Sequence, residues 1–134
     1  MIAWEPKFAL GVEVMDRQHQ RLIELANELA ARMGSAATGD EIAACVRALT
    51  DYTARHFWME ERLMADTGYE RSGLHGEQHQ ALLRELERLG EQMLRGAGTR
   101  RGMKALGFLR DWVTHHIQLS DRDFAKHLIS RGIL

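Results

Sequence analysis

The sequence predicts an all-α protein that folds as an up-down-up-down antiparallel four-helix bundle, with an N-terminal arm and a short C-terminal helix. Two observations predict this fold. The single proline among the 134 residues is Pro6, so the rest of the chain contains no residue that must interrupt a helix. Glycine-containing segments at 34–39, 68–73 and 96–102 divide it into four long stretches, whose apolar residues recur at steps of three and four.

Each of these stretches has the length and pattern of an amphipathic helix. The expected helices are residues 16–33, 40–66 and 72–95, and a fourth that begins near residue 101. Asp16 and Ser72 are expected N-caps, because their side-chain oxygens can accept the free amides of a first turn. Helices of similar length joined by short loops pack as antiparallel neighbours, which is the reason for predicting a bundle.

The whole chain, residues 1–134, is expected to form a single domain. Its parts are an N-terminal arm at 1–15, the four-helix bundle at 16–121 and a C-terminal segment at 122–134, in which 122–130 form a short fifth helix or extend the fourth. The arm is expected to pack its apolar side chains on the bundle: Trp4, Phe8, Leu10, Val12 and Val14.

Composition excludes several classes of protein. Hydrophobic residues make up 45% and charged residues 28%, as in ordinary globular domains. With 18 basic and 19 acidic residues the formal net charge is −1, which provides no field for nucleic acid or an anionic membrane. Cys45 has no partner for an intrachain disulfide. Because no signal peptide or membrane segment is recognisable, we expect a cytoplasmic monomer.

The histidines are the informative residues. Of the seven in the chain, five fall on the apolar stripes of the expected helices, together with Glu60: His19, His56, His75, His79 and His116. One histidine on an apolar stripe is most often a core residue whose hydrogen bonds are satisfied. Five on four helices need a common partner, because each buried polar group costs a few kcal/mol unless it is satisfied. A metal centre supplies that partner.

The spacing of these residues supports the same interpretation. His56 and Glu60 are four residues apart, as are His75 and His79, so each pair projects two donors from one helix face. Asp121 follows His116 by five residues, about 140° around an ideal helix. Both can face inward only if a wider turn or a bulge intervenes. Spacing alone therefore leaves Asp121 as either a ligand or a solvated carboxylate.

Four segments in this order resemble the ligand motifs of the hemerythrins: DRQH at 16–19, HFWMEE at 56–61, HGEQH at 75–79 and WVTHHIQLSD at 112–121. The likeness covers essentially the whole chain and is strongest to the single-domain bacterial hemerythrins. It implies a non-haem di-iron centre that binds O₂ reversibly for oxygen storage, delivery or sensing, and an oxygen-binding protein rather than an enzyme. The sequence identifies no acceptor oxygenase or signalling partner.

The resemblance also assigns the residues. It implies that one iron is held by His75, His79 and His116, that the other is held by His19 and His56, and that Glu60, Asp121 and an oxo or hydroxo group bridge them. If both irons are six-coordinate, one position stays open on the iron with two histidines. The O₂ pocket implied by the family is formed by Phe57, Trp112, Val113 and Ile117. Val113 stands where leucine is frequent, and Phe124 where several members have tyrosine.

Two alternatives use the same scaffold. The first is a di-iron oxidase, a peroxidase or a nitric oxide scavenger, and the second is an iron-storage or iron-sensing module. The di-iron oxidases and ferritin-like bundles use Glu-x-x-His motifs, which this sequence does not contain. The other residues near the motifs are not expected to bind metal. His115 and His127 are expected at the surface, Trp58 in packing, and Glu61 as a solvated charge or a support for the centre.

Overall fold

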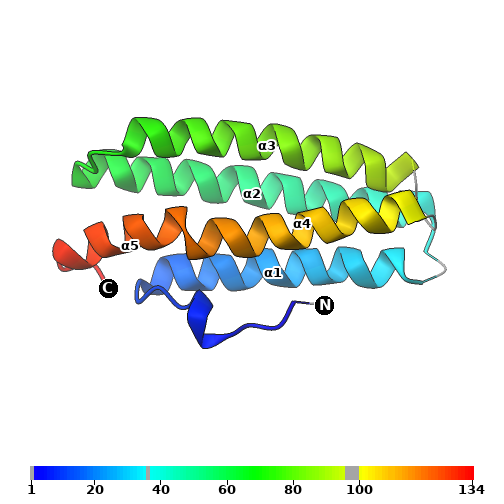
Figure 1. The fold of residues 1–134 in the computed structure, drawn as a ribbon, viewed down its shortest axis with the longest axis horizontal. Coiled ribbons are helices and arrows are strands. Elements are labelled where there is room, and N and C mark those ends of the chain that lie inside the picture. The colour runs from blue at the N-terminus through cyan, green and yellow to red at the C-terminus, as the bar shows by residue number, and fades with distance from the viewer. Residues whose placement is uncertain (1, 36, 96–99) are drawn as a thin grey trace.

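The computed structural model describes residues 2–35, 37–95 and 100–134. Its elements are a short 3₁₀ helix η1 (Pro6–Phe8) and the helices α1 (Glu13–Met33), α2 (Gly39–Thr67), α3 (Ser72–Arg95), α4 (Arg100–Gln118) and α5 (Ser120–Ser130). Helices α1 to α4 run alternately up and down, and α5 continues past the end of α4 (Figure 1). The described residues contain no strand, and the predicted four-helix bundle is confirmed.

The four long helices surround one interior. Contacts join α1 to α2, α2 to α3 and α3 to α4, and α4 packs back on α1. This arrangement is the one expected for helices joined by short loops. Part of the third expected loop, residues 96–99, lies outside the described residues. Among the helices that are described, none combines the length and the apolar character needed to cross a membrane.

The helix starts differ from the prediction in an instructive way. Helix α1 begins at Glu13, so Asp16 is not its N-cap. The Asp16 carboxylate instead accepts the amides of Leu10 (2.8 Å) and Gly11 (3.3 Å), and so it closes the turn in front of the helix. Gly11 permits that turn, because its φ of 86° favours a residue without a side chain. Ser72 is likewise the first helical residue of α3 rather than a cap before it.

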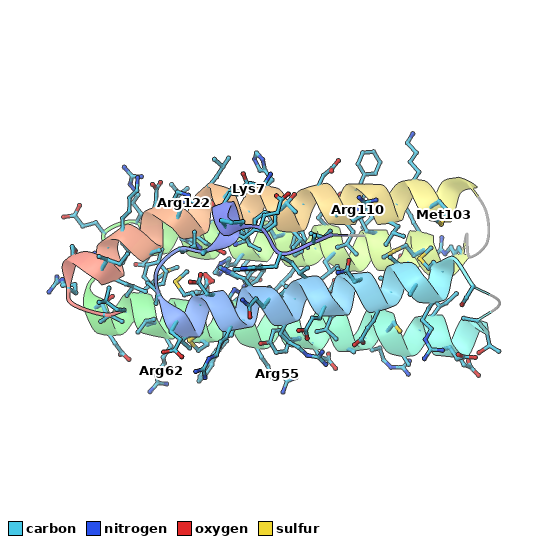
Figure 2. The ribbon with its side chains drawn as sticks, turned by 90° about the horizontal axis from the view of Figure 1, so that it is seen from below. Lys7, Arg55, Arg62, Met103, Arg110 and Arg122 are labelled. Atoms are coloured by element: carbon cyan, nitrogen blue, oxygen red, sulfur yellow. The ribbon has the colours of Figure 1, made fainter. Side chains whose placement is uncertain are left out.

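The N-terminal arm packs on the bundle as expected, with one exception. Its buried side chains include Phe8, Leu10 and Val12. Trp4 is half-buried with its ring centroid 5.7 Å from that of Phe8. Val14 was expected to pack as well, but it lies in the first turn of α1 and is 41% exposed. Arg122 of α5 donates to the Lys7 carbonyl and ties the arm to the C-terminal end (Figure 2).

The apolar core forms two clusters with a polar layer between them. The larger cluster includes Leu22 and Leu29 of α1, and the smaller one includes Met15 of α1 together with Phe124 of α5. On α1, His19 lies in sequence between Met15 and Leu22, and on α2 His56 and Glu60 likewise lie between Leu49 of the larger cluster and Met64 of the smaller one. The bundle therefore holds its buried polar residues in one cross-section.

Candidate metal centre

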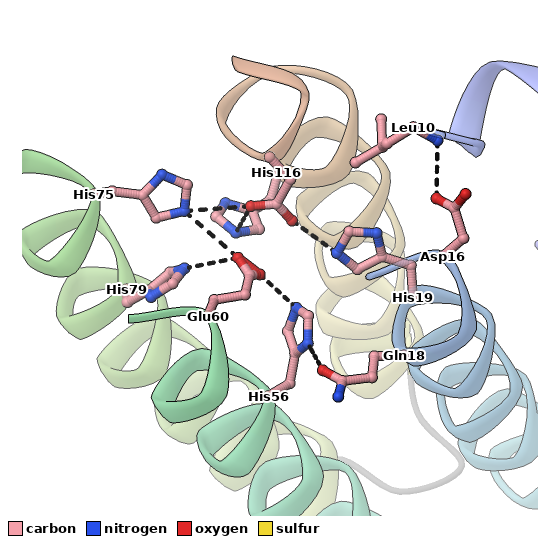
Figure 3. Close-up of polar contacts among 10 residues, drawn as sticks. Leu10, Asp16, Gln18, His19, His56, Glu60, His75, His79 and His116 are labelled. Carbon is pink, nitrogen blue, oxygen red and sulfur yellow. Dashed lines mark hydrogen bonds and ion pairs between the residues drawn. The ribbon is translucent and has the colours of Figure 1, made fainter. Parts of the chain in front are cut away.

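Seven buried polar side chains meet in this cross-section (Figure 3). They come from all five α helices: His19 from α1, His56 and Glu60 from α2, His75 and His79 from α3, His116 from α4 and Asp121 from α5. None is more than 8% exposed. The structure thus brings together every residue that the sequence analysis named as a metal ligand.

An interruption of the helix brings Asp121 inward. Helix α4 ends at Gln118, and α5 begins at Ser120 after Leu119, whose φ of −103° and ψ of −76° depart from helical values. Asp121 then lies in the first turn of α5 and is fully buried. Its Oδ1 is 3.1 Å from His116 Nε2. The wider turn that the five-residue spacing requires is therefore present as a break between two helices.

Glu60 faces histidines on both sides with different oxygens. Its Oε2 is 2.8 Å from His56 Nε2. Its Oε1 lies 3.7 Å from the Nε2 atoms of both His75 and His79. One carboxylate therefore joins a histidine of α2 to the histidine pair of α3.

Asp121 repeats this arrangement from the opposite wall. Its Oδ2 is 2.9 Å from His19 Nε2, and its Oδ1 is 3.3 Å from His75 Nε2 as well as 3.1 Å from His116. Each carboxylate consequently offers one oxygen to His19 or His56 and the other to the remaining histidines. We call His19 and His56 the two-histidine group, and His75, His79 and His116 the three-histidine group.

The polar atoms of the layer are close together but are not hydrogen-bonded to one another. The Nε2 atoms of His19, His56, His75, His79 and His116 and both oxygens of Glu60 and Asp121 have no hydrogen-bond partner among the described residues. Donor atoms of the three-histidine group and the two carboxylates all lie within 4.8 Å of one another, and so do those of the two-histidine group and the same carboxylates. Such buried atoms require a partner. The set of imidazoles and carboxylates fits a metal centre.

Burial and the contacts between histidines and carboxylates set the charges of the layer. Burial, assisted by the charges of His75 and His116, lowers the pKa of His79 to about 3, so its imidazole is neutral. Burial opposes protonation of His75, but Asp121 and Glu60 outweigh it and raise its pKa to about 9. Although burial also opposes their ionisation, histidine contacts hold the pKa of Glu60 and that of Asp121 below their usual values. Two anionic carboxylates are therefore ready to balance cations, and bound metal displaces protons.

One neighbour of the centre was missed by the sequence analysis. Gln18 Oε1 lies 2.5 Å from His56 Nδ1. The sequence contained a signal for it, since Gln18 continues the stripe of Met15 and Leu22 at the steps of three and four that singled out the histidines. The same periodicity therefore predicts that the Gln18 side chain faces the interior, beside the histidines.

Glu61 is related to the three-histidine group more loosely. Its Oε2 is 3.6 Å from His79 Nδ1, beyond hydrogen-bond distance, and its side chain is 37% exposed. Gly76 of α3 leaves room for it, because a Cβ at that position would stand 3.0 Å from Glu61 Oε1. Glu61 thus lies beside the centre and remains in contact with solvent.

The residues expected to form the O₂ pocket differ in burial. Phe57 stacks on the His79 ring at 3.8 Å and meets the His116 ring edge-on at 5.5 Å. Phe57, Val113 and Ile117 are buried. Trp112 is only half-buried, and its buried Nε1 has no hydrogen-bond partner among the described residues. Phe57 therefore forms an apolar wall of the centre, whereas Trp112 extends toward the surface.

The three-histidine group reaches the protein surface. His116 lines a surface pocket of about 260 Å³ whose other lining residues include the apolar side chains of Trp112 and Leu119. His75 lines a second pocket of about 410 Å³ between α3 and the start of α5. The exposed fractions of these histidines are 8% and 3%, against 0% for His19 and 2% for His56.

Two other assignments need correction. His127 is half-buried rather than a surface residue, since its Nε2 contacts the Thr67 carbonyl at 3.1 Å and holds α5 on α2. Trp58 was expected to serve in packing, but its side chain is 63% exposed, beneath the guanidinium of Arg62. Its position between His56 and Glu60 places it on the outer face of α2. His115 is exposed, as expected.

Comparisons with known proteins agree with this architecture. Residues 10–128 match the model of the hemerythrin HHE cation-binding domain. A bacteriohemerythrin of Pseudomonas aeruginosa is 35% identical over 96% of this chain and 84% of its own length. A bacteriohemerythrin of Clostridium acetobutylicum is 27% identical over 92% of this chain and 98% of its own.

A solved structure extends the agreement to three dimensions. A crystal structure of wild-type hemerythrin superimposes with a TM-score of 0.82 at 26% identity, and covers 96% of this chain and 98% of that one. The fold, the buried cluster of histidines and carboxylates, and the family model all agree. The chain belongs to the hemerythrin family.

Proposed function

We propose that this protein binds O₂ reversibly at a di-iron centre in the polar layer. The main observation in favour of the proposal is that the two oxygens of each buried carboxylate face different histidine groups. Glu60 and Asp121 each turn one oxygen to the two-histidine group and the other to the three-histidine group. Carboxylates that bridge two neighbouring cations need this arrangement, whereas a single ion would leave one group of histidines without a partner.

The residues that would hold the metal follow from this division. Glu60 and Asp121 would be shared, His75, His79 and His116 would complete one iron, and His19 and His56 would complete the other. Ferrous iron bound there supplies the electrons and the open coordination position that O₂ binding requires. The group with fewer histidines is the place for that open position.

The protein's own contribution is to exclude water and larger molecules. The two-histidine group is at most 2% exposed, and Phe57, Val113 and Ile117 are buried beside the ligand-bearing helix turns. A dry apolar surrounding favours a small neutral guest over water, and it limits side reactions of what is bound. The burial therefore supports a carrier of a diatomic molecule in preference to an oxidase that must admit an organic substrate.

The test is an optical titration. The metal-free protein is loaded anaerobically with ferrous iron, its iron content is measured, and air is then admitted and removed. We expect two irons per chain and a visible charge-transfer band that develops with O₂ and fades on deoxygenation. An iron-loaded protein that stays colourless in air would contradict the proposal. Turnover of a reductant in air without a reversible band would favour the oxidase alternative, and a mineral core would favour iron storage.

A further inference from the structure

We propose that Gln18 is the positioning residue of the two-histidine group and that it holds the His56 imidazole with Nε2 turned toward Glu60. This inference rests on the proposed metal centre and adds to it a residue outside the seven ligands. The contact joins two helices: Gln18 Oε1 of α1 and His56 Nδ1 of α2 lie 2.5 Å apart (Figure 3). Both partners are on the stripes that face the interior.

The contact selects one tautomer of His56. A carboxamide oxygen only accepts hydrogen bonds, so the imidazole nitrogen that faces it must carry a proton. A neutral imidazole has one N–H, and a proton on Nδ1 leaves the lone pair on Nε2. That Nε2 is 2.8 Å from Glu60 Oε2 and has no hydrogen-bond partner among the residues described. Gln18 therefore favours the form of His56 that can ligate a metal.

One turn of α1 serves both members of the group. Gln18 and His19 are consecutive, so their side chains leave the helix about 100° apart. His19 points into the layer while Gln18 points to His56 (Figure 3). The rings of His19 and His56 then meet edge to face, with centroids 4.9 Å apart. Any change at Gln18 therefore bears first on the two-histidine group.

The position of Gln18 decides which substitution is informative. Its side chain also lines a surface pocket of about 420 Å³ with Glu13, Arg17 and Leu134. A shorter side chain would admit water from this pocket, and water could replace the lost acceptor. Gln18→Met fills the same space and replaces the amide oxygen by a thioether sulfur, which is only a weak acceptor. Gln18→Glu keeps an oxygen in place, and Gln20→Met makes the same change at an exposed position of the same helix.

The experiment uses Zn²⁺ as a diamagnetic probe and so does not depend on O₂ binding. Calorimetry follows the binding of zinc to the metal-free wild type and the three variants, and NMR of histidine labelled with ¹⁵N follows the His56 Nδ1–H proton. We expect Gln18→Met to weaken one zinc equivalent by about 10- to 100-fold and to leave the other unchanged. The Nδ1–H resonance should move upfield, because its hydrogen bond to the Gln18 oxygen is lost. Gln18→Glu should restore binding, and Gln20→Met should behave as wild type.

Several results would overturn the inference. One is wild-type affinity for both zinc ions in Gln18→Met with an unchanged Nδ1–H signal, and another is equal weakening of both equivalents, which would indicate a packing effect. If Gln18→Met does not fold, Gln18→Glu decides alone: a charged acceptor strengthens the hydrogen bond and should move the Nδ1–H resonance downfield. No movement would refute the contact. Failure of the wild type to bind zinc would instead refute the proposed centre itself.

Discussion

The two histidine groups share their carboxylates but differ in their surroundings. His19 and His56 are sealed in the interior, and His56 is fixed by a hydrogen-bond contact with Gln18. In the three-histidine group, two of the members line surface pockets, and His79 Nδ1 has no hydrogen-bond partner within the described part of the chain, with the Glu61 carboxylate 3.6 Å away. The halves therefore differ in two respects: His75 and His116 border surface pockets whose linings include neither His19 nor His56, and His56 has a contact from outside the layer.

This difference gives the two halves of a nearly symmetric polar layer different surroundings. Under the proposed function, an iron held by His19 and His56 would lie away from these surface pockets, so a position left open on it would be available to a small guest. An iron held by the three-histidine group would lie nearer to the pockets, and its fuller set of protein ligands would leave water little opportunity to bind. Breaking each half separately tests whether the asymmetry governs function.

The largest effect is expected from Glu60→Gln, because this carboxylate faces both halves. Loss of its charge removes an anion that two cations would share, so iron content should fall from two per chain to one or none. Metal removal offers a second measurement. If free iron is at one hundred times the dissociation constant of each site, a chelator should lower the free energy of unfolding of the wild type by about 2.7 kcal/mol for each of the two sites. In Glu60→Gln the chelator should have little effect.

A comparison of His56→Ala with His79→Ala should separate the halves. His56→Ala leaves only His19 in the closed half, so we expect the loss of one iron and of the O₂-dependent band. His79→Ala leaves His75 and His116, and it should weaken metal binding while some reversible colour persists. Iron analysis and optical spectra of the two variants provide the test. Equal loss of the band with equal iron content would mean that the two halves are equivalent.

A smaller effect is expected from Val113, which is 2% exposed on α4 one turn before His116. Val113→Leu should fill space in the apolar wall and slow the oxidation of the iron-loaded protein in air several-fold, whereas Val113→Ala should speed it. Leu109→Val is a matched control, since it changes a buried residue one turn farther from the layer. The decay of the optical band measures these rates. If the control changes the rate as much as Val113→Ala, general loosening of the core is the cause.

Much of this molecule could be predicted because its pattern is helical throughout. Steps of three and four located the stripes, and the histidines stood out because they interrupt them. The starts of the helices were less predictable, since Asp16 can serve either as an N-cap or as an acceptor for the preceding turn. The turn of the arm at Gly11 brings the amides of Leu10 and Gly11 to the Asp16 carboxylate, and this tertiary feature determines that Asp16 accepts from the preceding turn. Val14 and Trp58 were misplaced for a similar reason, because an apolar residue does not reveal which face of a helix it occupies.

The amino-acid order was enough to specify four amphipathic helices and to put five imidazoles and Glu60 on their inner faces, because helical periodicity is a local property. Helical spacing left Asp121 open, since its orientation depends on the interruption at Leu119, and only the resemblance to the hemerythrins implied how the histidines divide into two groups. Those features, with the support of His56 by Gln18, arise where different helices meet. Contacts between residues far apart in the chain are set by packing of the whole bundle, which no local pattern encodes.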